Sequence, residues 1–149
     1  KDSNAWCAAF VGHVLTNLGF DVPGGSKYNA LRAAKYAKLG KGVALDEAKA
    51  GDLVIIQNPR TSGYHVGFFV DSTSNGIAIL GGNQNDEVNI TRYPSGRLIK
   101  NGIRRIDGME DISPEALKAV QADMSEFAGQ SITNMVHRVG DSISNLRTR

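Results

Sequence analysis

Cysteine is nearly absent from this sequence, which contains one among 149 residues. A single cysteine excludes an internal disulfide and a zinc site built from several thiolates, so its presence must be explained by packing or by reactivity. Long apolar runs are missing as well, since none approaches the roughly 20 residues that a membrane-spanning helix needs. We therefore expect no membrane span.

Charge of one sign is not in large excess either, because 17 Lys and Arg face 15 Asp and Glu and leave a net charge of +2. That is too little for dedicated nucleic-acid binding. Hydrophobic residues make up 41% and charged residues 21% of the chain, which is typical of a globular protein. The opening Lys1-Asp2-Ser3 has no methionine and no signal-like apolar segment, so we expect a piece of a longer or processed chain.

The charge is divided unevenly along the chain. Residues 1–106 hold 13 basic and 8 acidic side chains, whereas residues 107–149 hold 4 basic and 7 acidic ones. The sequence therefore predicts a folded domain over residues 1–106 and a tail over residues 107–149. The basic excess of the first part fits an anionic partner, such as bacterial cell wall or nucleic acid, or simply a solvated mixed surface.

Apolar periodicity predicts helices at both ends of the chain and strands between them. Helices are predicted over residues 5–18 and 27–38, and strands over 52–57, 64–71, 76–80, 87–93 and 98–106. The connections between these strands are too short for crossover helices, so we expect an antiparallel meander. Ser113-Pro114-Glu115 is typical of a helix start, and the tail beyond it predicts two amphipathic helices. The predicted class is α+β, with N-terminal helices packed on a five-stranded antiparallel sheet and a C-terminal helical extension.

Cys7 falls in the first turn of the first predicted helix. Unpaired backbone N–H groups and the helix dipole stabilise a thiolate there, so we expect a lowered thiol pKa and a nucleophilic cysteine. The alternative is a small core residue, because Cys7 shares an apolar face with Phe10 and Val11, and free cysteines are often buried.

His65 begins the strand predicted over residues 64–71 and is the candidate general base. Strand alternation puts His65 and the small Gly67 on one face, from which the imidazole can reach a helix end packed on the sheet. A nucleophilic cysteine needs a base within hydrogen-bonding distance and a third group that orients the base. His13 points away from the Cys7 face of the helix, and His137 would need the tail to fold over the site.

An amide-rich segment, Leu80-Gly81-Gly82-Asn83-Gln84-Asn85-Asp86, ends the strand that returns from the His65 strand through a hairpin. Asn83 is predicted to orient the imidazole by accepting a hydrogen bond from its N–H. Gln84, Asn85 and Asp86 stay open as rivals. The alternative is an ordinary turn, since Gly-Gly-Asn and Asn-Asp are turn formers.

Four segments of this sequence together resemble the CHAP and NlpC-type papain-like cell-wall hydrolases in order and spacing. They are Ala5-Trp6-Cys7-Ala8-Ala9-Phe10-Val11, Ala50-Gly51-Asp52-Leu53-Val54-Ile55-Ile56, Tyr64-His65-Val66-Gly67-Phe68-Phe69-Val70 and Leu80-Gly81-Gly82-Asn83-Gln84. The resemblance covers about residues 5–106. It implies a papain-like fold and cleavage of an amide bond in peptidoglycan, with Cys7 as nucleophile, His65 as base and Asn83 as orienting residue, and with no metal or other cofactor.

The implied mechanism is attack of a Cys7 thiolate on a carbonyl of the wall peptide, followed by hydrolysis of the thioester by water that His65 activates. The resemblance implies action in the periplasm or at the bacterial cell wall, by a protein that is secreted, delivered as an effector or carried by a phage. The choice between amidase and endopeptidase stays open. So do two other interpretations, a papain-like protein-modifying toxin (deamidase or acyltransferase) and a non-catalytic wall-binding module. The tail either completes the core or docks to another protein or domain.

Overall fold

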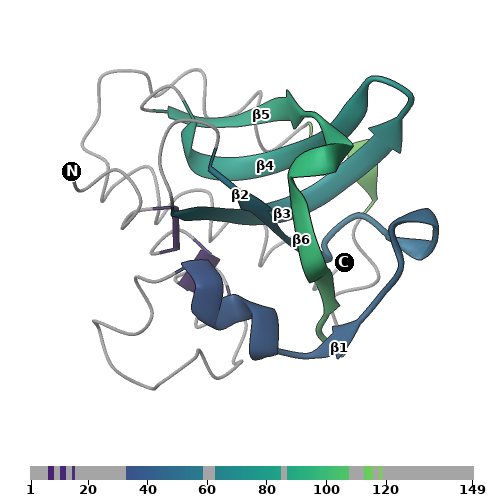
Figure 1. Ribbon diagram of the computed structural model, residues 1–149. Helices are drawn as coiled ribbons and strands as arrows, with labels where there is room; N and C mark the ends of the chain where they lie inside the picture. Colours follow the sequence, from purple (N-terminus) through teal and green to yellow (C-terminus); the bar gives the residue numbers. More distant parts are fainter. Residues whose placement is uncertain are drawn as a thin grey trace.

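A single antiparallel sheet dominates the computed structural model, which describes residues 7, 8, 11, 12, 15, 33–58, 63–84, 87–107, 113–115 and 118 (Figure 1). The strands are β1 (Lys41–Gly42), β2 (Leu53–Gln57), β3 (Tyr64–Thr73), β4 (Gly76–Gln84), β5 (Glu87–Tyr93) and β6 (Leu98–Arg105). Among the described residues, the 3-10 helix η2 (Ala33–Lys38) precedes β1, η3 (Leu45–Glu47) lies between β1 and β2, and η4 (Ser95–Arg97) lies between β5 and β6. The strand order across the sheet is β1-β6-β2-β3-β4-β5.

The predicted fold class was wrong. Within the described residues the sheet has six strands instead of five, and no helix there reaches seven residues, so this part is mostly antiparallel sheet and not the expected helices on a sheet with a helical extension. The sixth strand, β1, is two residues long, too short for periodicity to reveal. The helix predicted over residues 5–18 is described only in part. The described residues within it have α-helical backbone, namely Cys7, Ala8, Val11, Gly12 and Leu15.

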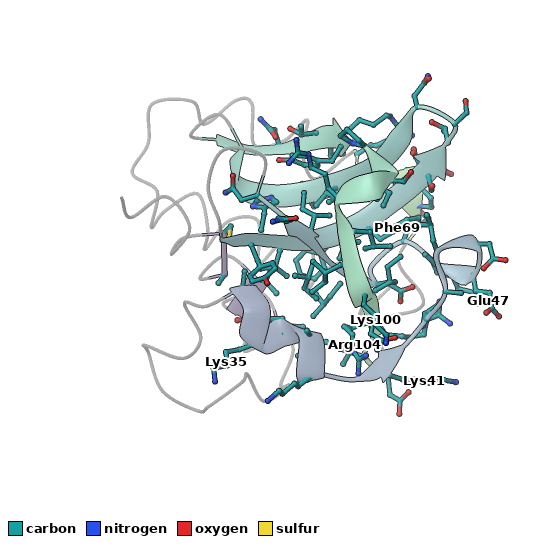
Figure 2. All side chains as sticks on the ribbon, viewed as in Figure 1. Lys35, Lys41, Glu47, Phe69, Lys100 and Arg104 are labelled. Carbon is teal, nitrogen blue, oxygen red and sulfur yellow. The ribbon has the colours of Figure 1, made fainter. Side chains whose placement is uncertain are left out.

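The second predicted helix also differs. Its described end is the 3-10 helix η2, and Gly40 follows with a φ of +65°, which ends the helical segment. Arg104 of β6 holds this end by donating hydrogen bonds to the carbonyls of Leu39 and Gly40, at 2.8 and 2.9 Å. Figure 2 shows Arg104 at the end of β6 that lies near Lys41 of β1. The fold therefore ties the segment before the sheet to its last strand.

The strands do not form a simple meander, because the last one returns to the far side of β2. β2, β3, β4 and β5 pair in sequence, whereas β6 pairs with β2 and β1. In Figure 1, β6 runs steeply in front of the other strands, with β4 and β5 at the top. The crossing passes through Pro94 and η4.

Both faces of the sheet are buried, which explains the crossing. One cluster contains Cys7, Ala8, Val11, Leu15, Ala33, Tyr36, Ala50, Leu53, Ile55, Val66, Phe68, Val70, Ala78, Leu80 and Ile106; we call it the first cluster. The second cluster contains Val54, Ile56, Phe69, Ile77 and Ile79, with Leu45, Ala48, Tyr93 and Leu98 packed against it. The chain has to lay Leu98 over the second face, because apolar side chains left in water would forgo the hydrophobic stabilisation.

The first residues of the tail contact the domain. Lys118 forms an ion pair with Asp71 of β3 at 3.7 Å. Pro114 lines a pocket of about 920 Å³ together with residues of η3 and of β3 that include Leu45 and Phe69. The predicted tail helices lie outside the described residues except at 113–115 and 118, and no described residue supports docking to another protein. No helix found in the described ranges is long and apolar enough to cross a membrane.

Candidate active site

Cys7 belongs to the first cluster and is 1% exposed. Ala8, Val11 and Leu15 are fully buried in the same cluster, so the helical face that they share with Cys7 is packed in the core. The burial of the thiol agrees with the interpretation of Cys7 as a small core residue. Burial alone does not exclude reactivity, which also depends on where the sulfur lies relative to His65 of β3.

The electrostatics of Cys7 differ from the prediction. Burial raises the pKa of the Cys7 thiol above its ordinary value, because desolvation disfavours the thiolate. Backbone hydrogen bonds from Val66, Ala8 and Cys7 itself act in the opposite direction and lower the pKa, but they do not overcome burial. The expected net lowering by the helix end was wrong, and the ground state of this site holds a neutral thiol.

The hydrogen bond from Val66 also locates the sulfur. Val66 is the second residue of the His65-Val66-Gly67 motif in β3, so its backbone N–H lies on the peptide that joins it to His65. The structure thus brings Cys7 to the start of β3, one residue from the predicted base. This juxtaposition joins two segments that are 58 residues apart in the sequence.

His65 is buried, with 6% of its surface exposed, and pairs with Ile56 of β2. Its ring contacts Tyr93 of β5, with centroids 5.7 Å apart and planes inclined by 46°. Gly67 follows two residues later, where β4 approaches so closely that a Cβ would meet the Leu80 carbonyl oxygen at 2.7 Å. The glycine of this motif is thus required by the packing of β4, and not only by the space an imidazole needs.

Tyr36 of η2 is a residue that sequence reasoning missed. It is fully buried, and its hydroxyl donates a hydrogen bond to the Ala8 carbonyl at 3.2 Å. Burial raises the pKa of Tyr36 far above its ordinary value, and the negative charge of an ionised Cys7 raises it further. The sequence offered one signal for its burial, an aromatic residue in a stretch rich in Ala and Lys. Through its hydrogen bond to Ala8, Tyr36 holds the helical turn that carries Cys7.

Asp52, in the motif Gly51-Asp52, serves a structural purpose at the other end of β2. Its carboxylate accepts hydrogen bonds from the Lys49 N–H at 2.8 Å and from Arg105 Nε and Nη2 at 3.0 and 2.9 Å. Leu53 pairs with Phe68, whereas Ile56 pairs with His65. Because a strand rises about 3.3 Å per residue, Asp52 is too far from His65 to orient it.

The predicted orienting residues are only partly described. Asn83 belongs to β4, but its side chain and that of Gln84 lie outside the described part, as do Asn85 and Asp86 entirely. His13 and His137 also lie outside it. No three or more His, Cys, Asp or Glu side chains are grouped to hold a metal ion in the residues that the structure describes.

Comparison with known proteins gives one match. The family model described as NlpC/P60 matches residues 1–103, which span Cys7, His65 and Asn83. Searches of curated proteins and of solved structures return no significant match.

Proposed function

Because this chain belongs to the NlpC/P60 family, whose members are typically cysteine peptidases of the cell wall, we propose that it cleaves an amide bond in the peptide of bacterial peptidoglycan. Cys7 is the nucleophile, His65 the general base and Asn83 the residue that orients His65. Residues 1–106 form the hydrolase domain, since the family match ends at residue 103 and Ile106 is the last described member of the first cluster.

The position of Cys7 at the start of β3 carries this proposal. The sulfur accepts a hydrogen bond from the Val66 N–H, and His65 is the preceding residue. A general base must lie within hydrogen-bonding reach of the proton it removes, and the start of β3 brings a buried thiol and a buried imidazole to one peptide. A cysteine that only filled the core would have no need of this neighbour.

The neutral thiol decides how the nucleophile forms. Since burial raises the pKa of Cys7, the proton leaves as the sulfur attacks: His65 takes it while the S–C bond forms and the carbonyl oxygen becomes an oxyanion. The Cys7 backbone N–H at the helix start can stabilise that oxyanion. When the C–N bond breaks, the leaving amine takes the proton from the imidazolium and a thioester remains. Water then attacks the thioester, His65 accepts its proton and returns it to the sulfur, and the acid product leaves.

The register of β3 and β4 supports Asn83 as the orienting residue. Phe68 pairs with Leu80 and Phe69 with Ile79 in antiparallel register. Phe68 and Leu80 are the last pair on the His65 side. His65 lies three residues before Phe68 in β3 and Asn83 three residues after Leu80 in β4, so both belong to the same end of the two strands. An asparagine there can accept the imidazole N–H and so fix the tautomer that presents a free nitrogen to the thiol.

The proposal is tested by mass spectrometry of purified peptidoglycan incubated with the protein and with Cys7→Ala, His65→Gln and Asn83→Ala. New termini that require Cys7 and His65 identify the bond and establish the hydrolase. We expect Asn83→Ala to lower the rate by at least about tenfold, because general base catalysis contributes 10² to 10⁴. Gln84→Ala is the matched control and should leave the rate within about threefold.

Other outcomes point to the alternatives. A Cys7 that reacts with iodoacetamide while walls of several chemotypes stay intact contradicts the wall hydrolase and favours modification of a protein substrate. A folded protein that binds peptidoglycan equally well as Cys7→Ala, with an unreactive thiol, is a binding module. A larger loss in Gln84→Ala than in Asn83→Ala would move the orienting role to Gln84.

A further inference from the structure

We propose that Tyr93 is the positioning residue of His65: its ring holds the imidazole in the orientation in which the base accepts the Cys7 proton. This inference rests on the proposed function of His65. It adds a residue of β5 to a site that the sequence motifs confine to the first helix, β3 and β4.

The ring contact has the geometry of a stabilising aromatic pair. The centroids of His65 and Tyr93 are 5.7 Å apart and the planes are inclined by 46°, and tilted rings are favoured at centroid distances of about 4.5–7 Å. His65 is 6% exposed, and its partner Ile56 is fully buried. The imidazole is thus confined between a strand of the core and an aromatic ring, which restricts rotation of its plane.

Tyr93 is itself held at a fixed place. It pairs with Ile77 near the β3–β4 hairpin and packs against the second cluster. Gly76 of that hairpin has a φ of +125°, and a Cβ there would overlap the Tyr93 carbonyl oxygen. Pro94 follows and fixes the backbone direction as the chain crosses to β6. A side chain anchored on these elements can hold a catalytic ring with little reorganisation.

Strand pairing alone does not bring Tyr93 to His65. Along β4, residue 77, which pairs with Tyr93, is six residues from residue 83, so flat strands would keep Tyr93 far from the start of β3. The ring of Tyr93 meets His65 while the same side chain packs against the second cluster. Tyr93 therefore contacts both the second cluster and the imidazole of His65, so packing of the cluster also fixes the orientation of the proposed base.

The test compares Tyr93→Leu, which removes the ring, with Tyr93→Phe, which keeps it. The readouts are kcat and KM on a peptidoglycan-derived peptide and the rate of Cys7 alkylation by iodoacetamide, which needs no substrate turnover. We expect Tyr93→Leu to lower kcat about tenfold with KM within twofold, and to slow alkylation toward the rate of His65→Gln. Tyr93→Phe should restore both to within about twofold of the parent.

Phe69→Leu is the matched control, because Phe69 is also an aromatic member of the second cluster, 4% exposed and labelled in Figure 2. It should lower the melting temperature and leave kcat and alkylation unchanged. Equal losses in Phe69→Leu and Tyr93→Leu, or in Tyr93→Phe and Tyr93→Leu, would overturn the positioning role. If Tyr93→Leu does not fold, Tyr93→Met takes its place with the same expected losses.

The two proposals fail in different ways. If His65→Gln has the alkylation rate and activity of the parent, the assigned base is wrong, and the role of Tyr93 falls with it. If His65→Gln is impaired and Tyr93→Leu is not, the base stands and only the positioning role of Tyr93 is overturned.

Discussion

The buried thiol of Cys7 links the folding stability of this protein to pH. Burial raises the pKa of Cys7 in the folded state, whereas an unfolded cysteine titrates near its ordinary pKa of about 8.5. Below that pH the thiol is protonated in both states and its contribution is fully present. As the pH rises toward the folded-state pKa, the unfolded chain loses its proton first, so the free energy of unfolding falls.

We predict that the free energy of unfolding of the parent falls relative to that of Cys7→Ala between pH 8 and pH 9.5, because only the parent has a thiol whose folded-state pKa is raised. Urea unfolding of both proteins at four pH values measures it. The range stays below the ordinary pKa of tyrosine, about 10, so Tyr36 does not interfere. A change of opposite sign would mean that the folded state holds a thiolate, as in a preformed ion pair with imidazolium.

At the residue scale, the roles of Cys7, His65 and Asn83 stay predictions, whereas the expected direction of the Cys7 pKa was wrong. Cys7 and His65 stood out because few residue types can perform nucleophilic and base chemistry. The pKa direction of Cys7 was wrong, because the helix dipole is visible from position in a helix while the desolvation that outweighs it depends on the whole first cluster. Tyr36 and Tyr93 were missed for the same reason, since each reaches the site from a distant segment.

At the scale of elements, the pair of Asp52 and Arg105 joins the start of β2 to the end of β6. The Asp52 side chain is 1% exposed and that of Arg105 21%, and Arg105 also donates to the Glu47 carbonyl at 2.9 Å. Arg105 thereby holds η3 to the sheet as well. Removal of one partner from a buried pair leaves an uncompensated charge, which costs more than the pair itself contributes.

Arg105→Met is therefore expected to lower the free energy of unfolding by about 3 kcal/mol. Adding Asp52→Asn in the same chain should recover at least about 1 kcal/mol, because no buried carboxylate then stays unpaired. Arg104→Met is the control: its guanidinium bonds two backbone carbonyls, and its loss should cost about 1 kcal/mol. Chemical denaturation of the parent, the two single variants and the double variant measures these free energies of unfolding. Equal losses of stability in Arg104→Met and Arg105→Met would contradict the buried-pair argument.

Strands were more predictable than their arrangement. β2, β3, β4, β5 and β6 lie close to the segments predicted from alternation and turn residues. Their connection was not predictable, because Pro94-Ser95-Gly96 reads equally well as a hairpin or as a crossing. The crossing is favoured because Val54 and Ile56 need a cover on the second face, a requirement that appears only when both sides of the sheet are considered together.

At the scale of the whole molecule, the ion pair between Lys118 of the tail and Asp71 contributes little to the stability of the described domain. The ion pair of Lys118 and Asp71 is long, at 3.7 Å, and its side chains are 55% and 29% exposed. Exposed pairs of this kind contribute about 0–1 kcal/mol. Pro114 adds one wall to the pocket beside η3.

We predict that residues 1–107 fold without the remaining tail and keep the proposed wall-cleaving activity within about threefold. The melting temperature should fall by less than about 8 °C, the shift that roughly 1 kcal/mol causes in a domain of this size. Calorimetry and the peptidoglycan assay on the truncated and full chains measure this. An insoluble or non-cooperatively melting product would show that the tail completes the core, and that the boundary at residue 106 is wrong.

The sequence by itself determined the chemistry available to this protein and the position of most strands. A cysteine beside helix-forming residues, a His-Val-Gly strand start and an amide-rich strand end are local patterns, and local patterns depend on neighbours in the chain. They sufficed to identify a family that the match over residues 1–103 confirms.

Only the tertiary structure decided how these pieces meet. It brought the Cys7 sulfur to the Val66 N–H, Tyr93 to His65, and Arg105 to Asp52. It also returned β6 to β2 and left the thiol neutral. Each of these outcomes depends on which distant side chains exclude water from the same volume, and burial of that kind is a property of the packed molecule that no segment of the sequence contains alone.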